Sequence, residues 1–127
     1  LVEGEDAHTL TDWGLRNEDD QDATREFAAM RLQAALLAPH GLRRFLAVTT
    51  DWRSVYDALP SDPLVGEAEE VMLAKRGYER ATQGPWASVL GEALEATAAL
   101  AQIAHRFAHN RSLWSTVEGV AQGPPQV

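Results

Sequence analysis

Two histidines four residues apart, His105 and His109, form the sharpest chemical pattern in the sequence. Residues at i and i+4 share one face of a helix, so both imidazoles could bind one zinc ion, with a third ligand from elsewhere in the chain. The HExxH arrangement of zinc proteases is absent, because Arg106 occupies the glutamate position. We favour the alternative that the pair lies near a helix C-terminus, where the helix dipole stabilises imidazolium.

Four glutamates, Glu67 with Glu70 and Glu92 with Glu95, form two pairs with a spacing of three. Each pair falls on one face of a predicted helix, and facing carboxylate pairs can hold Mg²⁺. Over residues 67–95 the pattern resembles the paired glutamate motifs of MazG-type nucleotide pyrophosphohydrolases, an all-α family. The resemblance implies a metal-dependent helical-bundle hydrolase in which carboxylate-bound Mg²⁺ activates water.

The sequence departs from that family's pattern at several positions. Ala68 stands where a second glutamate is usual, Leu73 and Ala74 supply no third acid, and Glu95 replaces the usual aspartate. We therefore favour solvent-facing acids near two helix N-termini, where the helix dipole stabilises negative charge. The favoured interpretation requires no cofactor, whereas the alternatives require Mg²⁺ or Zn²⁺.

Four residues are candidates for contacts with a protein partner. Arg76 and Arg80 share a helical face and could bind an acidic partner, although a basic last helical turn balanced by nearby acids is the alternative that we favour. Trp13 and Trp114 lie near predicted element ends, where an indole packs at a core edge or an interface.

Composition limits the classes of function. The 127 residues suffice for one domain, and the absence of cysteine excludes disulfides, thiolate nucleophiles, cysteine-ligated zinc and iron–sulfur clusters. A net charge of −8 argues against binding nucleic acid through its phosphates, and nine of the 19 acids lie within the first 26 residues. No apolar run is long enough to cross a membrane and no signal peptide is visible, so a cytoplasmic location is expected.

The elements that position these residues are predicted to be helices. Residues 1–19 form an irregular acidic arm, and a helix follows over 20–38 until Pro39, His40 and Gly41 end it. Residues 42–59 are ambiguous: their periodicity favours a helix with a break near Thr49, although 45–50 also suits a short strand.

The second half of the chain has clearer boundaries. Asp62 and Pro63 predict the start of a helix that ends at Gly84, and a long helix follows from about residue 85 to 109. Its apolar residues cover more than one face, which predicts a central position in the fold. Residues 111–120 are expected to form a short helix, and residues 121–127 a flexible tail.

The sequence thus predicts an all-α fold, a four-helix-type bundle with a short extra C-terminal helix, in a single helical domain over 20–120. The favoured function is that of a non-enzymatic protein-interaction domain that self-associates as a homodimer. It rests on the alanine-rich long helix, the tryptophans at element ends and the charged arm. The metal-dependent hydrolase or His-pair metal site is the alternative.

Overall fold

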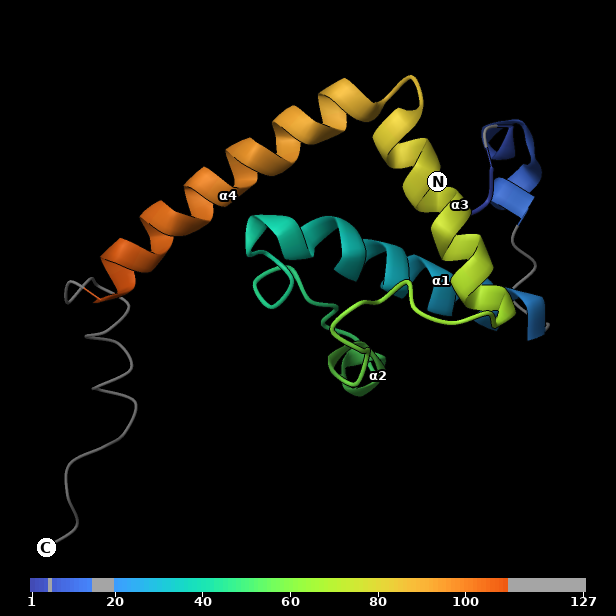
Figure 1. Cartoon of the computed structure of the whole chain (residues 1–127), viewed down its shortest axis with the longest axis horizontal. Helices are drawn as coiled ribbons and strands as arrows, with labels where there is room; N and C mark the ends of the chain where they lie inside the picture. Colours follow the sequence, from blue (N-terminus) through green and yellow to red (C-terminus); the bar gives the residue numbers. More distant parts are fainter. Residues whose placement is uncertain (5, 15–19, 110–127) are drawn as a thin grey trace, which may run out of the picture.

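The computed structural model describes residues 1–4, 6–14 and 20–109, in which all regular structure is helical (Figure 1). The α-helices are α1 (Asp20–Leu37), α2 (Arg53–Asp57), α3 (Glu69–Gln83) and α4 (Ala87–His109). Short 3-10 turns are η1 (Ala7–Thr9), η2 (Thr11–Gly14) and η3 (Ala38–His40). The all-α prediction is confirmed for these residues, whereas the helix expected at 111–120 and the tail at 121–127 lie outside them.

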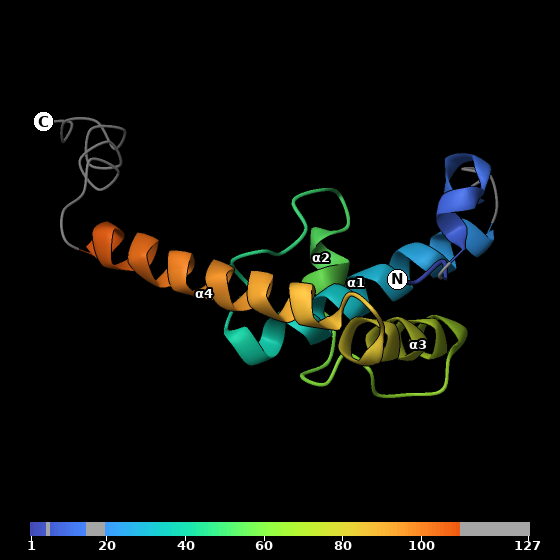
Figure 2. The same ribbon diagram turned by 90° about the horizontal axis from the view of Figure 1, so that it is seen from above.

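The centre of the fold is the contact between α1 and α3. Ala28 and Ala74 are fully buried there, beside Leu32 and the N-terminal Val2. The helices approach closely because Gly77 has no side chain: a Cβ at this position would lie 2.8 Å from Leu32 Cδ2. Small residues on both helices thus make room for the N-terminal segment, which lies beside α3 in both ribbon views (Figures 1 and 2).

A second apolar cluster lies between α1 and the segment that contains α2. Met30 and Ala34 of α1 pack against Ala47 and Tyr56, and Tyr56 is only 1% exposed. At the edge of this cluster Phe27 and Trp52 contact each other edge to face. The short α2 is therefore fixed by tertiary packing, since a five-residue helix is not stable alone.

The predicted end of the first helix is confirmed. Gly41 adopts the left-handed conformation, with φ of 69°, and Leu42 N–H donates to the Leu37 carbonyl over 3.1 Å. This is the hydrogen bond of a Schellman motif, in which glycine avoids the strain that a Cβ would introduce. The predicted end of α3 at Gly84 is also confirmed.

Of the helix predicted over residues 42–59, only a part after the expected break near Thr49 is found, as Arg53–Asp57, whereas residues 42–52 are not α-helical. The periodic residues of this segment are not buried together: Leu42 is covered, whereas Phe45 is 61% exposed. Without a covering element, the apolar stripe gains little from the helical conformation.

The start predicted for the next helix was also wrong, because α3 begins at Glu69 rather than after Pro63. Asp62 Oδ1 accepts the Leu64 N–H over 3.0 Å, so it closes a turn instead of capping a helix. Gly66 then takes φ of 117°, outside the helical region. The chain therefore reaches α3 in an irregular conformation.

The central position predicted for the last helix was wrong as well. α4 contacts α3 and η3, but most of its length runs away from α3 along one side of the molecule (Figures 1 and 2). Val89, Leu100 and Phe107 are each more than 60% exposed. Four helices are present and packed, but α4 is peripheral and carries a large uncovered apolar surface.

Candidate functional site

The four glutamates of the predicted carboxylate site are not brought together. Glu67 precedes α3 and Glu70 lies in its first turn, whereas Glu92 and Glu95 are exposed on the first half of α4. The length of α3, about 20 Å, separates its first turn from the connection to α4. Within residues 1–4, 6–14 and 20–109, no three side chains of His, Asp or Glu are grouped to hold a metal ion.

Glu70 has a structural partner instead. Its Oε1 lies 3.9 Å from Nη2 of Arg31, and Nη1 of the same guanidinium donates to the Pro63 carbonyl over 2.8 Å. Arg31 thus joins α1 to the irregular segment before α3 and to the first turn of α3. Both side chains are partly buried, which favours this pairing over an exposed one.

The two histidines lie at the end of α4, as predicted. His105 is exposed, and it lines a cavity of about 480 Å³ between α4 and η3 together with His40 and Arg106. His109 is the last residue of α4, and its side chain lies outside the described structure. The structure thus brings His40 and His105 to one cavity without completing a three-ligand group among the described side chains.

Of the two arginines expected to bind an acidic partner, Arg80 contacts this chain's own backbone, as does the neighbouring Lys75. Arg80 Nη1 donates to the Leu1 carbonyl over 2.7 Å, and Lys75 Nζ donates to the Gly66 carbonyl over 2.9 Å. Arg76 remains exposed on α3. The arginine pair is therefore split, with Arg80 holding the N-terminal segment and Arg76 facing solvent.

Of the two tryptophans expected at an interface, Trp13 belongs to η2, but its side chain and all of Trp114 lie outside the described structure. The arm that carries Trp13 does pack on the domain near its start. Val2 is 6% exposed within the α1–α3 cluster, and Ala7 is 4% exposed.

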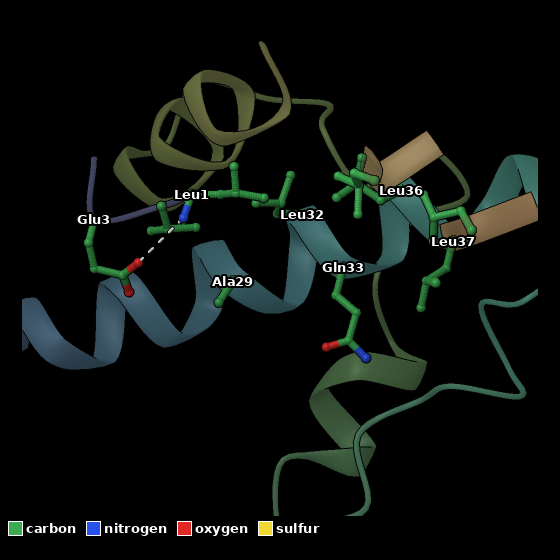
Figure 3. Close-up of a pocket in the computed structure, with 10 residues that line it drawn as sticks. Leu1, Glu3, Ala29, Leu32, Gln33, Leu36 and Leu37 are labelled. Atoms are coloured by element: carbon green, nitrogen blue, oxygen red, sulfur yellow. Dashed lines mark ion pairs between the residues drawn. The ribbon is translucent and has the colours of Figure 1, made fainter. Parts of the chain in front are cut away.

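An apolar groove of about 360 Å³ lies between α1, the first turns of α4 and the N-terminal segment (Figure 3). Leu32, Leu36 and Leu37 of α1 line it from one side, and Leu90 and Leu94 of α4 from another. Its polar groups are Glu3 and Gln33. Such a lining is almost entirely apolar and offers no paired acid and base for catalysis.

Another face of α4 carries an exposed apolar surface whose exposure the sequence analysis did not predict. Seven exposed apolar residues, here called the α4 stripe, follow a strict spacing of three and four: Trp86, Val89, Ala93, Ala96, Leu100, Ile103 and Phe107. Trp86 directly precedes the helix and is 70% exposed, and Phe107 near its end is 65% exposed. The spacing was visible in the sequence, but it was interpreted as core because it gives no information about which face is covered.

The α4 stripe has the pattern of the a and d positions of a heptad repeat, which pack one helix against another. None of the helices in the described part of the chain, α4 included, is both long and apolar enough to span a membrane. A continuous apolar patch exposed to water is typical of a protein-binding surface.

Comparison with known proteins adds no relative: no family model, no curated protein and no solved structure matches the chain. The function must therefore be inferred from the chain's own side chains, and the α4 stripe is the largest feature that its fold leaves unexplained.

Proposed function

We propose that this chain is a non-enzymatic helical protein-interaction domain that binds a protein partner through the α4 stripe. The observation that carries the proposal is that three successive heptads of apolar residues are exposed on one helix. Burying such side chains contributes about 1.5–3 kcal/mol for each large one, which favours association. The net charge of −8 favours a protein partner over nucleic acid.

The way in which α4 is held supports this function. α4 contacts α3 and η3, and Leu90 and Leu94 line the groove beside α1, so this face of the helix lies toward the domain while the α4 stripe is exposed. A helix fixed in this way loses little conformational freedom when it binds, which lowers the cost of association. The bulky aromatic residues Trp86 and Phe107, at the two ends of the stripe, are of the types that contribute most at protein interfaces.

The metal-dependent hydrolase has no comparable support within residues 1–4, 6–14 and 20–109, because its glutamates lie apart and Glu70 pairs with Arg31. The His-pair metal site likewise gains no third ligand among those residues.

Single substitutions on and off the stripe test the proposal. Leu100→Glu and Phe107→Glu place a charge on the stripe, and Gln102→Glu, on another exposed face of α4, is the matched control. We expect sedimentation velocity and chemical cross-linking to show that the wild-type chain assembles, either with a second copy or with a purified partner. The two stripe variants should lose this assembly, and Gln102→Glu should keep it. Circular dichroism checks that all three variants fold. An assembly that survives both stripe variants would contradict the proposal.

A further inference from the structure

Opposite charges lie at opposite ends of α4. Glu92 lies in its first half and Arg106 in its second half. Among the described residues, neither of these two side chains forms an ion pair within the chain. A second α4 running in the opposite direction would therefore bring acid opposite base at both ends.

The heptad positions make this complementarity specific. With Ala93, Leu100 and Phe107 at a positions, Glu92 and Arg106 both fall at g positions. In an antiparallel helix pair the g positions of the two helices face each other, whereas in a parallel pair a g position faces an e position. Only the antiparallel arrangement thus places Glu92 opposite the partner's Arg106.

The same register also matches the sizes of the apolar side chains. It pairs Val89 with the partner's Phe107, Ala93 with the partner's Ile103, and Ala96 with the partner's Leu100. Each layer then combines a smaller and a larger residue, which fills space evenly. A parallel pair would stack alanine on alanine in two layers and Phe107 on the partner's Phe107 in another, leaving voids next to crowded layers.

We propose that the partner bound by the α4 stripe is a second copy of this chain, with its α4 antiparallel and with Glu92 of each copy paired to Arg106 of the other. This inference rests on the proposed function and deepens it by naming the partner. The twofold symmetry repeats the ion pair and each apolar layer, so a single helix from each copy supplies a closed interface.

Charge reversal tests the pairing directly. Glu92→Arg places two arginines opposite each other at both ends of the dimer, and Arg106→Glu does the same with two glutamates. We expect each variant alone to dimerise about tenfold more weakly than the wild type. A mixture of the two variants restores both ion pairs, so we expect a heterodimer of wild-type affinity.

Glu95→Arg is the matched control, because it makes the same charge change three residues away at a c position, off the g positions. We expect it to change the dimer dissociation constant much less than Glu92→Arg does. If the wild type dimerises, but the two charge-reversed variants bind each other no more tightly than each binds itself, the pairing of Glu92 with Arg106 is overturned.

The direction of the helices is tested by a distance that does not depend on these charges. The chain has no cysteine, so Ser88→Cys, exposed in the first turn of α4, introduces a single site for a spin label. Antiparallel packing in this register separates the two labels by about 30 Å along the helix axis. A parallel dimer brings them side by side at about 10 Å, and a distance in that range would overturn the inference.

The failure of this inference is distinguishable from failure of the proposed function. If the wild-type chain stays monomeric but binds a purified partner of another kind, and Leu100→Glu abolishes that binding, the proposal of a second copy is overturned. The proposed interaction function of the α4 stripe then still holds. If the chain dimerises and neither Leu100→Glu nor Phe107→Glu weakens the dimer, both the proposed function of the α4 stripe and the antiparallel pairing are overturned.

Discussion

The hydroxyl of Tyr56 donates a hydrogen bond to the backbone carbonyl of Arg43 over 2.9 Å. The Arg43 guanidinium in turn donates to the carbonyls of Leu59 and Pro60, over 2.8 and 2.9 Å. The two residues therefore close the segment around α2 on itself through bonds that span 13 to 17 positions in the chain. Residues 42–52 make isolated turn hydrogen bonds, such as Leu46 N–H to the Leu42 carbonyl over 2.9 Å, and this network supplements them in place of a continuous helical ladder.

Removing the Tyr56 hydroxyl should destabilise the fold moderately. Tyr56→Phe leaves the buried packing in place but deprives the Arg43 carbonyl of its partner, which we expect to lower the free energy of unfolding by about 1–2 kcal/mol. Tyr56→Ala also leaves a cavity beside Met30 and Ala34, at a cost of about 3–5 kcal/mol. Urea denaturation followed by circular dichroism measures both values. Equal losses for the two variants would contradict this assignment.

Tyr56 should also make stability depend on pH under alkaline conditions. Burial raises the pKa of Tyr56 above its ordinary value, an effect that Arg43 and Arg53 oppose and Asp57 reinforces. In the unfolded chain tyrosine ionises near pH ~10, so the folded chain keeps this proton to a higher pH. The contribution is fully present below about pH 10 and is lost as the pH rises through the folded pKa.

Urea denaturation at about pH 9 and about pH 11, applied to the wild type and to Tyr56→Phe, isolates this contribution. We expect the wild type to lose more stability than the variant between the two values. The same loss in both proteins would mean that groups other than Tyr56 cause it.

The Arg43 guanidinium should contribute far more to the stability of the fold than the guanidinium of Arg44. Arg43→Met keeps an apolar stem but removes the hydrogen bonds to Leu59, Pro60 and Ser61, and we expect a loss of about 2 kcal/mol. Arg44→Met is the control, because Arg44 is exposed and a surface substitution of this kind changes stability by about 0.5 kcal/mol or less. Thermal denaturation of both variants checks the difference, and similar midpoints would refute it.

Replacing glycine with alanine should change the stability of the fold in opposite directions at Gly41 and at Gly91. Gly41→Ala forces a Cβ onto a left-handed backbone with φ of 69°, and we expect it to cost about 1 kcal/mol. Gly91→Ala places the same methyl group in open space on α4, where the better helix propensity of alanine stabilises by about 0.5–1 kcal/mol. Chemical denaturation gives the two signs, and a stabilising Gly41→Ala would show that the α1 terminus tolerates the strain.

The sequence predicted those elements whose signals are local. The end of α1 depends on Pro39 and Gly41, and the end of α3 on Gly84, so both boundaries were found. The region around α2 depends on contacts such as Arg43 with Leu59, 16 positions apart, and no local pattern reveals these. For the same reason the spacing of Leu42, Phe45 and Leu46 predicted a helix, although Leu42 is the only one of the three that the fold buries.

The candidate sites show the same limit. The spacing of Glu67 and Glu70, or of Glu92 and Glu95, gives neighbours on one helix, but it cannot give the distance between the pairs. The apolar residues of α4 were recognised, yet their spacing does not tell which of them line the groove beside α1 and which are left exposed. Only the folded chain shows that Leu90 and Leu94 line the groove beside α1. The α1 residues of this groove are labelled in Figure 3.

The contact of the first residues with α3 imposes an order on folding. Val2 packs against Ala74, and the Leu1 carbonyl accepts a hydrogen bond from Arg80, 79 positions later. During synthesis these first residues leave the ribosome long before their binding surface exists, because α3 has yet to be made. Val2 also packs against Ala28 and Leu32 of α1, so its complete binding surface exists only once both α1 and α3 are in place, and docking closes a loop of 79 positions.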